Sequence, residues 1–205
     1  MAREIIALDI DGVLADWVSF GVPKLNNILG TKVSINDEIS FEIHKVFGVS
    51  RKKMHWAYDK LYSEFSISDA KPVAGAQAAV NELAKTFELI AITARPKKFW
   101  RETEDWLNRY FDKEIIVHFG TGAGKPVGGE QHLDDKLTLC NKFNALYLVE
   151  DNPAEILSCL KTNTTPLCHA WPWNKSIESN KNVTRGDWEY LEKFINENEK
   201  KNISN

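Results

Sequence analysis

A short apolar run near the start of the chain, residues 5–8, is followed directly by Asp9 and Asp11 and then by Gly12. The run has the length and composition of a buried β-strand. Residues i and i+2 of a strand lie on one face, so we expect both carboxylates side by side at its carboxyl end. Two like charges about 4 Å apart repel by roughly 4 kcal/mol at an effective dielectric constant near 20. Folding stability alone gives no reason for such a pair, and it therefore indicates a functional site.

A second acidic pair, Glu150 and Asp151, ends another apolar run, residues 145–149, and Pro153 follows where it can open a helix. We expect the two runs to be neighbouring strands of an open parallel sheet, in which ligands bind outside the carboxyl ends of the strands. Four carboxylates would then meet at one edge. A hard cation with oxygen ligands neutralises such a cluster, and we predict that the chain binds Mg²⁺ there.

Helical and strand patterns divide the 205 residues into two parts. Residues 17–71 show helical spacing and no strand pattern, and we interpret them as a small helical cap inserted after the first strand. From Pro72 onward strands alternate with helices, a rhythm typical of a parallel α/β sheet. The prediction is a doubly wound, Rossmann-like parallel sheet core made of residues 1–16 and 72–205. Its polar end, 196–205, is expected to fray.

Composition limits the classes of partner. The formal net charge of −3 argues against a strongly basic surface for nucleic acid, so we expect a small anionic ligand and no stable nucleic-acid complex. The 3 cysteines have no CxxC spacing and fit reduced thiols. The first residues carry no basic and apolar leader, and no apolar run is long enough to span a bilayer. We expect a cytoplasmic protein without membrane contacts, and a homodimer is compatible with the sequence.

The first acidic pair has the parts for a two-step reaction on a phosphate ester. Asp9 ends the strand and is the more fixed of the two, so we assign it as the nucleophile that attacks phosphorus. Asp11 lies in the turn at Gly12, nearer an incoming substrate, and can pass a proton to the departing oxygen as general acid and base. The structural alternative is that one aspartate only caps the next turn, because Asp-Gly is a common turn dipeptide.

Polar residues at later strand ends can bind the phosphate of such an ester. Thr93 ends a strand before a helix, so its hydroxyl and the following backbone N–H groups can grip phosphate oxygens, with an ordinary helix cap as the alternative. We expect the nearby Arg95 to face the substrate. Lys136 opens a short helix before the second acidic strand, where its ammonium can neutralise charge on the transferring phosphoryl group. Lys125 is a second candidate for that role.

A glycine-rich loop, residues 120–129, contains Lys125 and invites comparison with a P-loop. The spacing before its Gly-Lys pair is one residue short, Pro126 stands where Ser or Thr should bind Mg²⁺, and no helix follows. We interpret it as an active-site loop over the strand ends. Trp17 and the segment 171–174 could stack a nucleobase, although burial is the commoner role of such side chains.

The order of these features carries a family resemblance. Asp9-x-Asp11-Gly12-Val13, Thr93, Lys136 and Glu150-Asp151 resemble the four motifs of haloacid dehalogenase-like phosphatases, with a helical insert after the first. The run Asp11-Gly12-Val13-Leu14-Ala15-Asp16, the small insert, Pro72-Val73-Ala74-Gly75-Ala76 and the late Trp-containing helix look like the 5′(3′)-deoxyribonucleotidase group. The chain departs from that group at Glu150, where an aspartate is usual, and at Ala94-Arg95, which replaces a Ser-Pro type pair.

The resemblance implies a Mg²⁺-dependent phosphomonoesterase that forms a phosphoaspartyl intermediate on Asp9, with Asp11 as general acid and base. It implies that Mg²⁺ is bound by Asp9, the backbone carbonyl of Asp11 and Asp151, while the place of Glu150 beside Asp151 makes it a further candidate ligand. The residues expected to bind phosphate are Thr93, the Ala94 amide and Lys136, and those expected near the rest of the substrate are Trp17, Arg95 and Lys125.

The substrate that this resemblance favours is a deoxynucleoside monophosphate, and two alternatives stay open. The Thr93-x-Arg95 arrangement is also similar to the 3′-phosphatase domain of phage-type polynucleotide kinases, which act on nucleic-acid ends. A catalytically silent protein that binds phosphate is the alternative from another class. Hydrolytic dehalogenases of the same fold need neither a second aspartate nor a metal, and Asp11 argues against them.

Overall fold

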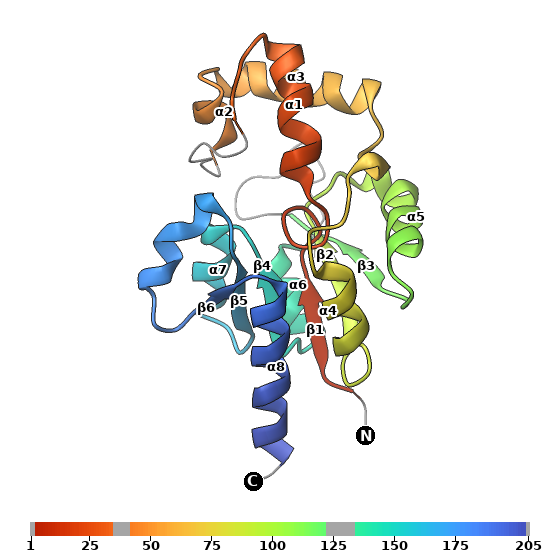
Figure 1. The fold of residues 1–205 in the computed structure, drawn as a ribbon, viewed down its shortest axis with the longest axis vertical. Helices are drawn as coiled ribbons and strands as arrows, with labels where there is room; N and C mark the ends of the chain where they lie inside the picture. The colour runs from red at the N-terminus through yellow and green to blue at the C-terminus, as the bar shows by residue number, and fades with distance from the viewer. Residues whose placement is uncertain (1–2, 35–41, 122–133, 204–205) are drawn as a thin grey trace.

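A parallel sheet organises the computed structural model, which describes residues 3–34, 42–121 and 134–203 (Figure 1). The described residues form six strands in the order β3-β2-β1-β4-β5-β6, and every neighbouring pair is parallel. The strands are β1 (Ile5–Leu8), β2 (Glu88–Thr93), β3 (Ile116–Phe119), β4 (Tyr147–Glu150), β5 (Thr165–His169) and β6 (Thr184–Gly186). The predicted doubly wound α/β fold is confirmed, and β6 is a strand that the sequence patterns did not predict.

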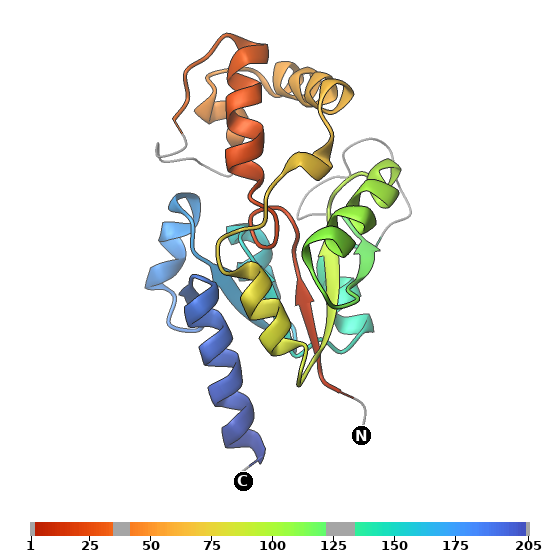
Figure 2. The ribbon, with the colours of Figure 1, turned by 45° about the vertical axis from the view of Figure 1, so that its right-hand side comes forward.

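Helices cover both faces of this sheet (Figures 1 and 2). They are α4 (Ala76–Leu83), α5 (Trp100–Tyr110), α6 (Lys136–Lys142), α7 (Pro153–Cys159) and α8 (Trp188–Ile203). Side chains alternate along β1, so Ile6 and Leu8 pack in a core with α4, α5 and α8. Ala7 packs in a second core with α6 and α7. The covered faces leave the carboxyl ends of the strands as the place where a ligand can reach the sheet.

The helices that follow β1 lie beyond these carboxyl ends (Figures 1 and 2). They are α1 (Trp17–Leu29), α2 (Ile43–Val46), α3 (Arg51–Glu64) and the 3-10 turn η1 (Ile67–Asp69), and further 3-10 turns are η2 (Lys97–Phe99) and η3 (Pro172–Ser179). Asp16 caps α1 by accepting from the amide of Ser19 at 3.0 Å. We propose that residues 17–71 act as a cap on a core of 1–16 and 72–205, because these helices gather at one end of the sheet.

The last described residues of the chain are helical. Helix α8 continues to Ile203, so residues 196–203 of the predicted frayed tail are helical in the structure, and fraying of this end stays a prediction. Glutamate and lysine in this stretch are good helix formers. The Asn198 side chain also hydrogen-bonds to Tyr147, which anchors the helix to β4. A contact to a residue far back in the chain thus maintains order that a polar composition alone does not indicate.

The imidazole of His169, at the end of β5, is held in an apolar setting. His169 is 4% exposed, and neither ring nitrogen has a hydrogen-bond partner among the described residues. The rings of Trp171 and Trp188 flank it, with centroids 5.8 and 5.9 Å away. Burial lowers the pKa of His169 to about 4, because a charged imidazole would lose its hydration there. The folded protein therefore keeps this side chain neutral.

We expect His169→Phe to make the fold less sensitive to acid. The unfolded chain gains a proton at this position near pH 6.5 and the folded chain near pH 4, so stability present above pH 6.5 is lost as the pH falls through this window. The wild type should lose roughly 3 kcal/mol from this group by pH 4, and the variant should not. Urea unfolding between pH 4 and 8 measures the difference, with the exposed His55→Phe as control. Parallel pH dependence of wild type and His169→Phe would contradict this account.

Candidate active site

Three buried carboxylates meet at the carboxyl end of the sheet. Asp9 directly follows β1, Glu150 ends the adjacent β4, and Asp151 comes next in the chain. A carboxylate oxygen from each residue lies within 4.8 Å of the other two. The amide of Asp9 donates to the carbonyl of Val149 at 2.9 Å, so strand pairing itself places the first acidic segment against the second. The structure thus brings together the two segments that the sequence analysis placed at one sheet edge.

Lys136 supplies the positive charge of this cluster. Its ammonium lies 2.7 Å from Asp9 Oδ1 and 2.7 Å from Glu150 Oε2, and its side chain is 5% exposed. The lysine begins α6, and Asp135 caps that helix by accepting from the amide of Thr138 at 2.7 Å. A capped helix end therefore directs the ammonium into the acidic cluster.

Glu150 uses both of its carboxylate oxygens within the protein. Oε2 accepts from Lys136, and Oε1 accepts from the amides of Asp151 and Asn152, each at 3.0 Å. The glutamate side chain is one methylene longer than the usual aspartate, and it folds back over its own loop while still reaching the lysine. Glu150, which the sequence analysis considered as a further metal ligand, thus orients Lys136 and the loop that carries Asp151.

The cluster holds more negative than positive charge. Burial and the Glu150 carboxylate raise the pKa of Asp9 to about 7, although Lys136 opposes the shift. Burial and the same carboxylate also raise the pKa of Asp151. Burial alone would lower the pKa of Lys136, but the Asp9 and Glu150 carboxylates raise it instead. Three carboxylates against one ammonium leave a buried excess of negative charge that a divalent cation would neutralise.

Asp11 lies in the turn after β1 and is paired with Arg95. The guanidinium Nε donates to Asp11 Oδ2 at 2.8 Å, and Nη2 donates to Oδ1 at 2.7 Å. A third donor, Nη1, reaches the hydroxyl of Thr103 at 3.3 Å. The sequence analysis expects Arg95 to face the substrate, whereas the structure pairs it with Asp11. The arginine is buried, and its guanidinium is occupied by side chains of the protein.

Thr93 ends β2, the strand beside β1, with its hydroxyl oriented by the backbone. Its Oγ1 accepts from the amide of Arg95 at 3.1 Å. An oxygen that accepts from the backbone keeps its proton for another acceptor. Ala94, between these two residues, is exposed. The phosphate-binding role of Thr93 and the Ala94 amide stays a prediction.

Trp17 packs among the helices beyond the sheet. Its indole Nε1 donates to the hydroxyl of Tyr62 at 3.2 Å, and its ring centroid lies 5.9 Å from that of Tyr58. Both tyrosines belong to α3, whereas Trp17 begins α1. Its immediate partners are side chains of the cap, and stacking on a nucleobase stays a prediction.

Lys125 and residues 122–129 of the glycine-rich loop lie outside the described residues. The loop leaves the sheet at Gly120, whose amide donates to the carbonyl of Thr93 at 2.9 Å. The start of the loop is therefore adjacent to the predicted phosphate-binding turn, and the role proposed for Lys125 stays a prediction.

Three indoles from the last third of the chain contact the site, and the sequence analysis missed this role. Trp171 Nε1 donates to the carbonyl of Gly12 at 2.5 Å, and Trp188 Nε1 donates to that of Val13 at 2.8 Å. Trp173 Nε1 donates to Asp151 Oδ2 at 3.2 Å. The Trp-Pro-Trp-Asn run was visible in the sequence as a possible stacking surface. Its alternative use, with Trp171 as an N–H donor to the turn after β1 and Trp173 as one to Asp151, could not be inferred from spacing.

Gly12 allows the turn to approach the second acidic segment. Its φ is +89°, and a Cβ at this position would lie 2.2 Å from Asp151 Oδ2. Any other residue would have to displace the carboxylate or strain the backbone. The close approach of this turn to the Asp151 carboxylate therefore depends on the absence of a side chain at Gly12.

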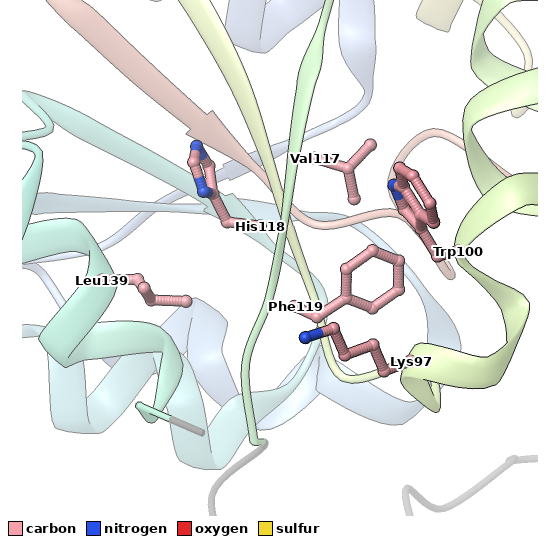
Figure 3. A pocket seen from close by; sticks show the side chains of 6 residues that line it. All are labelled: Lys97, Trp100, Val117, His118, Phe119 and Leu139. Atoms are coloured by element: carbon pink, nitrogen blue, oxygen red, sulfur yellow. The ribbon is translucent and has the colours of Figure 1, made fainter. Parts of the chain in front are cut away.

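A cavity of about 360 Å³ lies at the outer edge of the sheet, at β3 (Figure 3). Its lining residues are Lys97, Trp100, Val117, His118, Phe119 and Leu139, and none of them belongs to the acidic cluster. Phe119 pairs in register with Thr93. The cavity thus stands one strand away from the predicted phosphate-binding turn and does not enclose the acids.

Comparison with known proteins assigns the chain to a family. Residues 3–171 match the family model described as 5′ nucleotidase, deoxy (pyrimidine), cytosolic type C. The chain belongs to this family. A Bacillus cereus protein provisionally named a nucleotidase is 31% identical over 153 residues, which cover 71% of this chain and 75% of that protein. A similarly named protein of Oceanobacillus iheyensis is 25% identical over 139 residues, covering 67% of this chain and 70% of that one.

Solved structures agree with the fold of this nucleotidase-family protein. A haloacid dehalogenase-like hydrolase from Streptococcus pneumoniae matches with a TM-score of 0.65 at 14% identity, covering 94% of this chain and 98% of that one. One from Xanthomonas campestris matches with a TM-score of 0.57 at 9% identity, covering 95% of each chain. These likenesses show the fold. The family match and the relatives confirm a phosphoric monoester hydrolase near the 5′(3′)-deoxyribonucleotidases.

We expect Asp9→Asn to stabilise the metal-free protein at neutral pH. The pKa of Asp9 is about 7 in the folded chain and 3.8 in the unfolded chain. The stability that is present below pH 3.8 is therefore lost as the pH rises to 7. An amide avoids this loss, and the variant should gain roughly 2–4 kcal/mol at pH 8 and nothing near pH 4. Urea unfolding with a chelator measures the gain, with the exposed Asp105→Asn as control. A variant equally or less stable than wild type at pH 8 would refute the charge excess.

Proposed function

We propose that the protein is a Mg²⁺-dependent phosphomonoesterase that acts on deoxynucleoside monophosphates through a phosphoaspartyl intermediate on Asp9. The observation that carries this proposal is the position of Asp9, buried between the Lys136 ammonium and Asp151 at the carboxyl edge of the sheet. A carboxylate with a fixed cation beside it and a second acid two residues on is suited to nucleophilic attack on phosphorus.

Each residue of the site then has a defined part in the reaction. Asp9 attacks phosphorus as the bond to the ester oxygen breaks, and Asp11 donates a proton to that departing oxygen. Asp11 next takes a proton from water, which attacks the phosphoaspartate, so that inorganic phosphate leaves and Asp9 is restored. Thr93, the Ala94 amide and Lys136 hold the phosphoryl oxygens during both steps.

The residues present fit a divalent cation. The three buried carboxylates exceed the single buried ammonium in charge, and the pKa values of Asp9 and Asp151 are raised accordingly. We assign Asp9, the backbone carbonyl of Asp11 and Asp151 as the ligands of Mg²⁺, which prefers oxygen donors. When bound, the ion would neutralise charge on the phosphoryl oxygens and keep the Asp9 carboxylate ionised.

The proposed substrate class rests on the family. Its description names a 5′ nucleotidase, deoxy (pyrimidine), which supports deoxynucleoside 5′-monophosphates as the first substrates to test. A 3′-phosphatase acting on nucleic-acid ends draws less support, because Arg95, on which that similarity rests, is bound to Asp11. A silent phosphate-binding role draws less support, because Lys136 pairs with Asp9 and Arg95 pairs with Asp11, the residues to which we assign the reaction.

A cytoplasmic location is part of the proposal. The three cysteines are buried and free, as reduced thiols are, and the family description names a cytosolic enzyme. In the part of the chain that the structure describes, no helix has both the length and the apolar character to cross a membrane. A homodimer stays a prediction.

We expect Asp9→Asn to abolish turnover, because an amide cannot attack phosphorus. A phosphate-release screen should compare deoxynucleotides, ribonucleotides, sugar phosphates and 3′-phosphorylated oligonucleotides, with and without Mg²⁺. The wild type should prefer deoxynucleotides and require Mg²⁺, and the variant should fall by at least about 1000-fold on every substrate. Asp105→Asn serves again as the charge-matched control. If Asp9→Asn released phosphate at the wild-type rate, the assignment of the nucleophile would be wrong.

We expect Trp173→Phe to weaken Mg²⁺ binding by about tenfold, because the indole N–H that orients the Asp151 carboxylate is lost. The rise of the Tm with Mg²⁺ concentration measures this affinity without a substrate. Trp56→Phe, at an exposed position on α3, is the matched control and should titrate like the wild type. An unchanged midpoint in Trp173→Phe would show that this hydrogen bond does not prepare the cation site.

A further inference from the structure

The pairing of Arg95 with Asp11 joins two parts of the site that are 84 positions apart in the chain. Two parallel N–H donors meet the two oxygens of one carboxylate, at 2.8 and 2.7 Å. The arginine side chain is 2% exposed, whereas that of Asp11 is 29% exposed. The carboxylate is therefore held from its protein side and open on the other.

The guanidinium is also held by contacts other than Asp11. Nη1 donates to Thr103 Oγ1 at 3.3 Å, and the guanidinium carbon lies 5.9 Å from the centre of the Trp106 ring. Both partners belong to α5, which packs on the sheet. Burial disfavours the charge on Arg95, yet the Asp11 carboxylate raises the pKa of the guanidinium above its usual value. The arginine is thus a fixed cation with a defined plane.

A proton donor at Asp11 needs such support. The residue lies beyond the end of β1, in a turn whose next residue is Gly12, so the strand ladder does not fix its side chain. Proton transfer in the reaction requires an oxygen within hydrogen-bonding distance of the ester oxygen, and a misplacement of about 1 Å can cost 100-fold in rate. A bidentate guanidinium fixes both the position and the plane of a carboxylate, which an ammonium cannot do.

We propose that Arg95 is a positioning residue that holds the Asp11 carboxylate in the orientation for proton transfer with the leaving group. The inference rests on the proposed function. Arg95 follows Thr93 by two residues, and its amide donates to the threonine hydroxyl. The turn that we propose to bind phosphate therefore also orients Asp11. Arg95 acts through Asp11 and does not itself contact the reacting atoms.

The dependence on the leaving group tests this role. Single-turnover release of the leaving group should be measured for a deoxynucleotide, whose alkoxide needs a proton, and for 2,4-dinitrophenyl phosphate, whose phenolate does not. Arg95→Met should slow the first substrate by about 10- to 100-fold and the second by less than about 3-fold. Arg95→Lys should share this pattern, because a lysine keeps the positive charge but cannot donate to both carboxylate oxygens in the bidentate geometry of a guanidinium. A purely structural defect would slow both substrates equally, and that result would overturn the proposal.

A double-mutant cycle with Asp11→Asn shows whether Arg95 acts through the aspartate. Asp11→Asn alone should reproduce the selective loss on the deoxynucleotide. Adding Arg95→Met to it should cost no more than about a further 2-fold, because the residue that the arginine positions has already lost its function. Full additivity of the two losses would overturn the proposal, as would a single variant Arg95→Met that matches the wild type on the deoxynucleotide.

Matched variants separate this outcome from misfolding and from failure of the proposed function. Arg101→Met removes an exposed arginine from α5 and should leave both rates unchanged. Thr103→Val removes only the contact that steadies Nη1 and should give a smaller loss with the same selectivity, even if Arg95→Met fails to fold. Selectivity that is absent from both Thr103→Val and Arg95→Lys counts against the proposal. If the wild type releases no phosphate from either substrate, the proposed function fails first.

Discussion

The pairing of one buried ammonium with two buried carboxylates is the interaction on which the site depends. Lys136 lies 2.7 Å from both Asp9 and Glu150, and it thereby ties α6 to the ends of β1 and β4. A buried ion without a partner costs several kcal/mol, and these contacts offset that cost only in part because a third carboxylate, Asp151, remains. This excess negative charge lowers the stability of the fold, and it also makes the site suited to a divalent cation.

Much of this arrangement follows from rules that act over short stretches of sequence. The carboxyl ends of neighbouring parallel strands share an edge, so the meeting of Asp9 with Asp151 could be predicted from two apolar runs that end in acids. Lys136 could be placed because it begins a helix just before the second of these runs. Local composition did not indicate that α8 continues past residue 196, where Asn198 binds Tyr147.

The direction of individual side chains lay beyond such rules. From sequence, an arginine two residues after a phosphate-binding threonine indicates a group that faces substrate. Contacts with Thr103 and Trp106 on α5 instead direct the Arg95 side chain toward Asp11. The spacing of residues in the sequence does not predict a contact between positions 84 residues apart. The tryptophans pose the same problem. Their clustering is visible in the sequence, whereas the aim of each indole N–H depends on how η3 and α8 pack against the turn.

The bond between Trp188 and the carbonyl of Val13 spans 175 positions and has a consequence for biosynthesis. The turn that carries the acids is synthesised well before the indole that secures it, because 175 positions separate the two residues. A nascent chain can pair its first strands well before that moment, yet its phosphate-processing centre is completed only when the C-terminal helix docks. Maturation of the site therefore waits for a segment that is synthesised 175 residues after the turn that it secures.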